Sequence, residues 1–253
     1  MRIFLKTEDE IILLRAASQL ATRALIEVGR HVVPRLALSH LRNKVVNAVM
    51  RTVPTESNSG KEALSSDTEF TFFVNGAYVE PSLEGECMLC EGDWLTVNCW
   101  VCLDGYYSFG AHTFIVGSSQ DDEPMTSTLI DMLRQVVRRA SAGHSIKEMS
   151  RTVYSLHSHD PYVLQKTFGH GVGRNRVENP IFRMNPGVND AVLLKEGMCL
   201  VIALAFKHGR SHLIKPRLMH ESTFHNPFVP FGTTVVVRPG RPEILTSFET
   251  IVK

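Results

Sequence analysis

Two pairs of cysteines have the spacing of a tetrahedral metal site. Cys87 and Cys90 form one CxxC pair, and Cys99 and Cys102 form a second. Thiolates at this spacing bind zinc in many small domains. Only eight residues separate the pairs, however, and the second pair lies in a strand-like run, where positions 99 and 102 point to opposite faces. We therefore expect free thiols here, with a zinc site as the alternative.

A single histidine lies in a glycine-rich segment that offers a second kind of chemistry. Residues 168–174 read FGHGVGR, with His170 at the third position. Closely spaced glycines cradle phosphates where a strand precedes them and a helix follows, and that context is missing here. We expect a tight bend in which His170 is a hydrogen-bonded interior residue, with a functional imidazole as the alternative.

The elements that must position these residues begin with two helices. Thr7 and Glu10 form a capping box, and the apolar positions after them predict an amphipathic helix that ends near Gly29. A second helical pattern covers about 39–51. The stretch 52–69 is polar, contains Pro and Gly, and predicts a loop.

Strand-like runs follow, and the same order of elements then begins again. The first strands are expected at 70–78, 94–103 and 106–116, and a turn signal at Gly105 joins the last two in a hairpin. Helical patterns return at about 125–140 and 145–157, with strand patterns near 162–168, 198–206, 212–218 and 231–237. This repetition indicates one α+β domain over residues 1–253, with pseudo-symmetric halves at about 1–120 and 121–253.

Composition excludes several classes of function. The chain has 27 Lys and Arg against 26 Asp and Glu, so its net charge of +1 argues against a general nucleic-acid binder or a polybasic membrane protein. The longest apolar run, 198–206, is too short to cross a bilayer, and the N-terminal residues carry no apolar signal segment. Five cysteines, an odd number, indicate a reducing compartment, for which we expect the cytoplasm or another reducing compartment inside the cell.

Several segments together resemble one known family. The stretch FGHGVGR is similar to the GHGIGR motif of the type I methionine aminopeptidases, in the pita-bread (creatinase/aminopeptidase) superfamily. Residues 6–21 resemble that family's opening helix, and 89–117 resemble its two-aspartate hairpin without a gap. Residues 195–198 (KEGM) and 243–246 (EILT) also match in order. The resemblance implies an α+β pita-bread fold, with pseudo-two-fold halves and helices outside a curved, mainly antiparallel sheet.

The resemblance implies chemistry for which this chain lacks most of the residues. The family holds two divalent metals with two Asp, one His and two Glu, and a bridging water becomes the nucleophile. Such cations prefer carboxylate oxygens. Carried over position by position, only the histidine is retained, as His170. The two aspartates fall on Asn98 and Phe109, and the two glutamates on Ala203 and Gly232.

The family's two substrate-assisting histidines are also replaced. One aligns with Glu80 and the other with Val177, which directly precedes Glu178. Asp93 and Asp104 are not expected to substitute for the lost carboxylates, because each belongs to a turn. We therefore expect neither a metal nor another cofactor.

Three hypotheses for the function remain. We favour a catalytically inactive homologue that acts as a binding, structural or regulatory component and holds a protein or peptide partner. The first alternative is a metal-free hydrolase of altered mechanism, since the superfamily includes the metal-free creatinases. It would require Glu80, Glu178 and His170 to converge as an acid–base set. The second is a metal-dependent methionine aminopeptidase. The sequence leaves the identity of a partner and the oligomeric state open.

Overall fold

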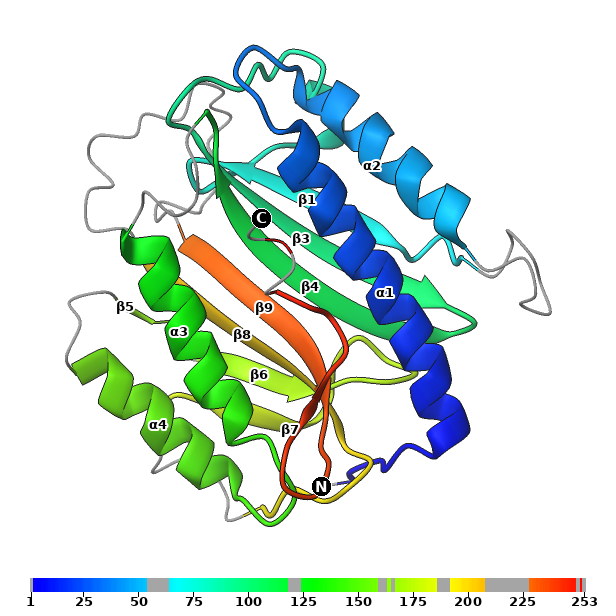
Figure 1. Ribbon diagram of the computed structural model, residues 1–253, viewed down its shortest axis with the longest axis vertical. Coiled ribbons are helices and arrows are strands. Elements are labelled where there is room, and N and C mark those ends of the chain that lie inside the picture. Colours follow the sequence, from blue (N-terminus) through cyan, green and yellow to red (C-terminus); the bar gives the residue numbers. More distant parts are fainter. Residues whose placement is uncertain are drawn as a thin grey trace.

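The computed structural model describes residues 2–53, 64–117, 124–158, 163–164, 167–185, 192–207, 228–248 and 251. In these ranges a curved sheet carries its helices on one face (Figure 1). The first half contains α1 (Glu8–His31), α2 (Leu38–Thr52), β1 (Glu69–Val74), β2 (Ala77–Tyr78), the 3-10 helix η2 (Pro81–Leu83), β3 (Trp94–Leu103) and β4 (Tyr106–Ile115). The second contains α3 (Pro124–Arg138), α4 (Ile146–Ser158), β5 (Val163–Leu164), β6 (Thr167–Gly171), β7 (Glu178–Arg183), β8 (Cys199–Lys207), β9 (Phe228–Val236) and β10 (Glu243–Ile244).

Within the described ranges, the strands form a ten-stranded sheet that runs through both halves. Its order is β2-β1-β3-β4-β9-β8-β6-β7, with β10 paired to β9 and β5 to β8. Each of these pairs is antiparallel, and the halves meet where Ala111 of β4 lies opposite Gly232 of β9. The expected α+β class, with helices outside a curved antiparallel sheet, is confirmed.

Local signals set the first helix and the central hairpin. The Thr7 hydroxyl accepts the Glu10 N–H, and the Glu10 carboxylate accepts the Thr7 N–H, so the predicted capping box begins α1. Strands β3 and β4 are joined at Asp104 and Gly105, which both have positive φ (50° and 76°). Two residues of this conformation form the tight turn that matches the twist of paired strands.

Other predictions need correction. The run at 70–78 is two strands, β1 and β2, separated by a turn at Asn75-Gly76. Strand β7 was not expected, and neither was β10. Residues 167–171 form strand β6 rather than the tight bend that the glycines suggested. The strand expected at 212–218 lies outside the described residues.

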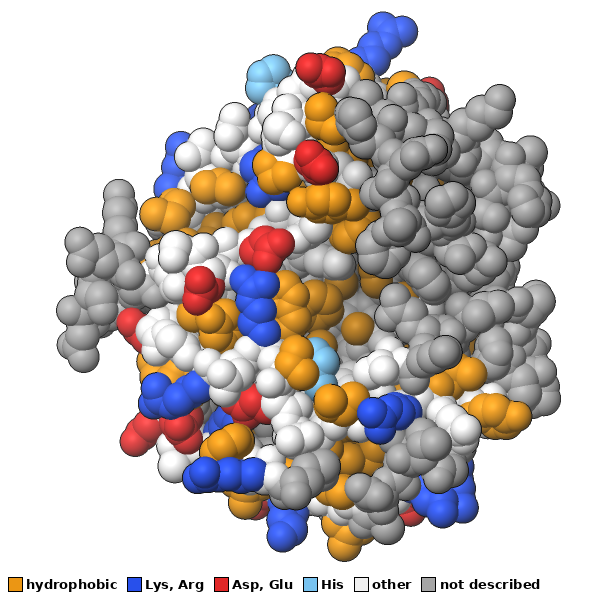
Figure 2. All heavy atoms as spheres, turned by 180° about the vertical axis from the view of Figure 1, so that it is seen from behind, with side chains coloured by type: hydrophobic (Ala, Val, Ile, Leu, Met, Phe, Trp, Pro, Cys, Tyr) orange, Lys and Arg blue, Asp and Glu red, His pale blue; other side chains and the backbone are white. Residues whose placement is uncertain are grey.

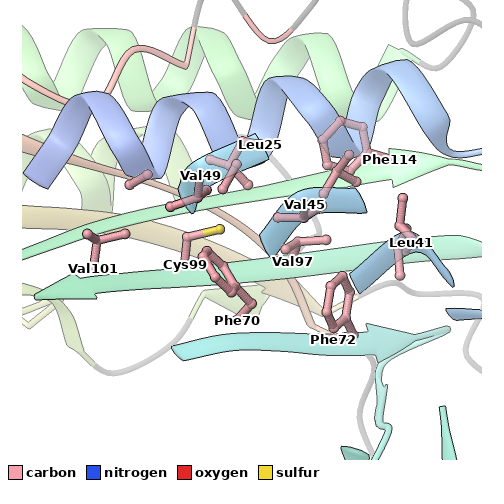
Figure 3. Packing of buried hydrophobic residues seen from close by; sticks show 14 of the residues in the cluster. Leu25, Leu41, Val45, Val49, Phe70, Phe72, Val97, Cys99, Val101 and Phe114 are labelled. Carbon is pink, nitrogen blue, oxygen red and sulfur yellow. The ribbon is translucent and has the colours of Figure 1, made fainter. Parts of the chain in front are cut away.

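The helices bury one face of the sheet. Leu25 of α1 and Val45 and Val49 of α2 pack over β1, β3 and β4 (Figure 3). A matching cluster lies beneath α3 and α4. It contains Leu133 of α3, the helix that packs over β8 and β9, and Met149 of α4, which lies nearer β7. The side chains of the opposite face of the sheet are therefore available for a site. In the described part of the chain, no helix has the length and apolar character required to span a membrane.

Candidate functional site

Strand alternation places the predicted site positions on the face that the helices leave uncovered. Val97, Cys99 and Val101 of β3 point into the helix-covered core, so Asn98 and Trp100 point to the other side.

The register of the sheet then aligns these positions across four strands. Asn98 lies opposite Ala111, Ala111 opposite Gly232, and Gly232 opposite Ala203. His170 of β6 extends the row, since it pairs with Val201, two residues before Ala203 on the same strand.

Figure 2 shows this face of the molecule, with a hollow lined mainly by hydrophobic side chains and a histidine beside it. We use the name cleft for the part of this face that carries Asn98, Trp100, Phe109, His170 and Ala203.

The ring of Phe109 fills space at the centre of the cleft. Its side chain is buried and packs against Trp100, with ring centroids 4.7 Å apart. A Cβ atom added to Gly232 would lie 2.6 Å from Phe109 Cε1 and 3.0 Å from the Ala203 Cβ. The ring therefore occupies the volume that any side chain at position 232 would need. Phe109 and Gly232 are sterically complementary.

His170 is held as a neutral imidazole. Its Nδ1–H donates to the Gly171 carbonyl at 2.8 Å, and its ring stacks on Trp100 at 6.1 Å and 11°. Burial lowers the pKa of His170, and the hydrogen bond to Gly171 opposes this only in part. Nε2 then carries a lone pair, and no described residue donates a hydrogen bond to it. The expected hydrogen bond from this imidazole to the backbone is present.

The glycines around His170 are required by close approach rather than by a bend. A Cβ on Gly169 would lie 2.4 Å from the Val201 carbonyl oxygen, and one on Gly171 would lie 2.5 Å from that of Asn179. Neither glycine has positive φ, and the pairing of β6 with β7 shifts register beside each of them. These positions hold β6 tightly against its neighbours and so fix the place of His170.

Asn98 brings a buried polar atom to the cleft. Its Oδ1 is buried and accepts no hydrogen bond from the described residues. A buried carbonyl oxygen without a donor is costly, so this atom is a ready acceptor for a ligand that brings an N–H or O–H group.

The cleft residues do not fit a pair of divalent cations. They offer one amide oxygen, one neutral imidazole and apolar surface, and a cation would lose more hydration energy than such dipoles return. Across the described ranges, no group of three or more His, Cys, Asp or Glu side chains could hold a metal ion. The Phe109 ring stands in the middle of the row that would have to coordinate it.

The proposed acid–base set of Glu80, Glu178 and His170 does not assemble. Glu178 is buried in an ion pair with Lys6 (2.5 Å), and its other oxygen accepts the Asn175 N–H. Glu80 is exposed at the start of η2, where its side chain makes no capping bond. No hydrogen bond links the three groups in the described structure.

Val177 and the two aspartates also lie away from the cleft chemistry. The Val177 side chain is 57% exposed. The Asp93 carboxylate accepts from Asn75 Nδ2 (3.0 Å) and from the Cys90 N–H (2.7 Å), which stabilises a turn. Asp104 lies in the hairpin turn. Both aspartates therefore have the structural roles expected of them.

The described structure joins none of the cysteines in a disulfide bond. Cys99 is buried in the apolar core beneath the helices, where burial raises its pKa. Cys102 belongs to the opposite face of β3, as expected from strand geometry. Cys87 is buried and Cys90 is half-buried. The described structure thus shows two thiols of the second pair that cannot share one ion.

Sequence reasoning missed the rim of the cleft. Trp100 contacts both Phe109 and His170, and its place two residues after Asn98 on a strand could have revealed it. Tyr107 and Arg176 join it at one end, with Arg176 Cζ 5.6 Å from the Trp100 ring centroid and 5.7 Å from that of Tyr107. Arg176 had no local signal, because these aromatic residues are about 70 positions away in the sequence.

Comparison with known proteins identifies the family to which this fold belongs. Residues 12–211 match the model of metallopeptidase family M24. The chain belongs to this family. It is 28% identical over 225 residues to a methionine aminopeptidase of Helicobacter pylori, with 85% of this chain and 87% of the relative covered.

Solved structures of other proteins share the fold of this M24 protein. A methionine aminopeptidase from Thermotoga maritima superposes with a TM-score of 0.79 at 21% identity, covering 97% of this chain and 100% of the other. The N-terminal domain of the FACT complex subunit SPT16 from chickpea gives 0.69 at 17% identity, covering 98% of this chain and 60% of the other. The resemblance to methionine aminopeptidases and the pita-bread fold are confirmed.

Proposed function

We propose that this M24 protein is a catalytically inactive relative of methionine aminopeptidase that holds a peptide or protein partner in its cleft. The packing of Phe109 into the space beside Gly232 carries the proposal. The Phe109 ring puts an apolar surface where the family has a carboxylate. Gly232 has no side chain, so it leaves the space that this ring needs.

The cleft lacks the carboxylate ligands that metal-dependent hydrolysis requires. Metal-bound water ionises near neutral pH, whereas free water has a pKa of about 15.7. Without metal ligands no residue of the cleft supplies that activation. The metal-free alternative is not favoured, because Glu178 is committed to Lys6 and Glu80 is exposed.

The features that remain suit binding. The cleft combines aromatic surface with two acceptors, Asn98 Oδ1 and His170 Nε2, that could take N–H groups from a peptide. The fold also occurs in SPT16, a subunit of a complex, so the scaffold is not restricted to peptidases.

Metal content and turnover test the inactive part of the proposal. Dialysed protein should contain no stoichiometric divalent metal by elemental analysis. It should release no N-terminal methionine from peptides with added cobalt, manganese, iron or zinc. About two metal ions per chain, or turnover of about 1 per second or more, would contradict the proposal.

Capture from the source cell tests the binding part. Wild-type protein and two variants serve as baits, and bound proteins are identified by mass spectrometry. Asn98→Leu removes the orphan acceptor at similar volume, and Asp131→Asn alters an exposed site on α3 as a matched control. A cleft partner should be retained by wild type and Asp131→Asn and lost from Asn98→Leu. Equal retention by all three would place the partner elsewhere.

A further inference from the structure

The loop between β6 and β7 contacts the end of the β3–β4 hairpin on both of its faces. The residues between β6 and β7 carry Arg174 and Arg176, and the hairpin presents Tyr106 and Tyr107 at the start of β4. Consecutive strand residues point to opposite faces. Arg174 Cζ lies 4.6 Å from the Tyr106 ring centroid on the α1 side, where the Tyr106 hydroxyl donates to Glu10 at 2.7 Å. Arg176 takes the cleft side.

Arg176 ties the second half of the molecule to the rim of the first. Its Nη1 donates to Glu69 Oε2 at 2.7 Å, and its Nη2 donates to the Asp67 carbonyl oxygen. The Tyr107 hydroxyl donates to Asp67 Oδ2 at 2.6 Å. With its guanidinium against Trp100 and Tyr107, Arg176 therefore lies across one end of the cleft.

The base of this loop is held by backbone and buried contacts, whereas the ion pair of the Arg176 side chain lies at the surface. The Tyr107 N–H donates to the Gly173 carbonyl at 2.8 Å, and the Asn175 N–H is held by Glu178, which Lys6 pairs. By contrast, the side chains of Arg176 and Glu69 are 34% and 52% exposed. Exposed ion pairs of this kind contribute about 1 kcal/mol or less, so loss of the Glu69 pair weakens the hold on the Arg176 side chain while the loop stays.

What Arg176 covers is the aromatic wall of the cleft. Trp100 contacts Phe109 and stacks with His170, so it forms the surface on which a ligand side chain would rest. A guanidinium against the same ring takes up part of that surface and is attracted by it.

We propose that Arg176, held by Glu69, is the gate of the cleft and the residue that determines its specificity. In the closed position it keeps large apolar side chains away from Trp100. Release from Glu69 opens this surface to an aromatic or long aliphatic side chain. The inference rests on the cleft being the binding site, and it names the residue that regulates it.

Accessibility of Trp100 tests the gate without any ligand. The chain has two tryptophans, so a Trp94→Phe background leaves Trp100 as the only reporter. Acrylamide quenching is compared for this background and for Arg176→Gln and Glu69→Gln in it. Loss of an exposed ion pair should raise the quenching constant about two- to fivefold in both variants. Arg174→Gln, which removes the grip on the opposite side, is the matched control and should leave it unchanged.

Salt should act in the same direction as the variants. Raising NaCl from about 0.1 M to about 1 M shortens the Debye length from about 10 Å to about 3 Å. The quenching constant should rise with salt in the background protein and stay level in Glu69→Gln. Unchanged quenching in Arg176→Gln and Glu69→Gln, both folded by circular dichroism, would overturn the gate and leave the proposed function untouched.

A defined probe tests the specificity. The amide of 4-fluorophenylalanine, followed by fluorine NMR, supplies an aromatic side chain and N–H donors. Apparent affinity scales with the population of the open state, so Glu69→Gln should bind this probe about two- to fivefold more tightly than wild type. Higher Trp100 accessibility without tighter binding would show that Arg176 does not control the cleft.

Discussion

At the scale of single residues, the cleft shows substitutions that depend on one another. The Phe109 ring and the missing side chain at Gly232 share one volume, so either change alone would have left a void or a clash. The five family positions were identified from resemblance, and the pairing of β3, β4, β9, β8 and β6 brings them to one face of the sheet. Their mutual packing could not be predicted, because it depends on strands that are more than 100 residues apart.

Truncation of Phe109 measures how much this packing stabilises the protein. Phe109→Ala removes a buried ring from between Trp100 and Gly232, and we expect a loss of about 3 kcal/mol in the free energy of unfolding. Urea denaturation provides the measurement. Phe73→Ala on strand β1, where the ring is only half-buried, is the control and should cost less. Equal losses would mean that Phe109 adds no special packing.

His170 should make stability dependent on pH. Its pKa is lowered by burial from the ordinary value of 6.5, so the unfolded chain binds its proton more readily than the folded protein. This contribution is complete above pH 6.5 and is lost as the pH falls through the folded pKa. His170→Gln lacks it. The stability difference between wild type and His170→Gln should therefore shrink from pH 7.5 to below pH 6; a constant difference would contradict burial of a neutral imidazole.

At the scale of elements, the sequence predicted those with strong local signals. The capping box at Thr7 and the turn at Asp104-Gly105 each depend on residues that are close together in the sequence. Helix α1 and the β3–β4 hairpin are therefore present as expected. Strands β2 and β10 have two residues each and owe their conformation to neighbours. The glycines at 169 and 171 suggested a bend because the sequence does not show which backbone they approach.

The N-terminal segment is fastened to the second half by one buried ion pair. Lys6 and Glu178 are each 5% exposed, and removal of one partner leaves an uncompensated charge in the interior. Lys6→Met should cost about 3 kcal/mol or more in urea denaturation.

The double variant Lys6→Met/Glu178→Gln is the control for this prediction. It has no unpaired charge and keeps the amide oxygen that can accept the Asn175 N–H. We expect it to be more stable than Lys6→Met alone. A single variant as stable as the double variant would mean that solvent reaches Glu178.

At the scale of the whole molecule, the fold has kept the frame of a metallopeptidase around an altered centre. The two halves meet at Ala111 and Gly232, beside Phe109, and the Phe109 N–H and carbonyl both bond to the Thr234 hydroxyl across the junction. Phe109, the residue that we propose keeps metal out of the cleft, is therefore also part of the contact between the halves. Restoration of a site must change this centre as a unit.

Variants that restore a single carboxylate should not bind metal, and the reason differs between positions 98 and 232. Asn98→Asp supplies one carboxylate beside apolar neighbours and should bind no metal. Gly232→Glu should destabilise the protein, since its Cβ would lie 2.6 Å from the Phe109 ring. Thermal unfolding with and without manganese distinguishes the two results. A metal-dependent rise in melting temperature for Asn98→Asp would show that the cleft is closer to a metal site than its chemistry indicates.

Joint restoration should recover metal binding on this scaffold. The variant Asn98→Asp/Phe109→Asp/Ala203→Glu/Gly232→Glu places four carboxylates around His170 and removes the ring that blocks position 232. Without metal, repulsion among these charges should lower the melting temperature below that of wild type. With manganese or cobalt, binding to the folded state alone should raise it again, whereas wild type should not respond. The same variant with His170→Ala is the control and should bind more weakly. A folded quadruple variant whose melting temperature changes with neither metal would contradict this prediction. It would show that the five side chains carry the required charge but do not converge on one ion.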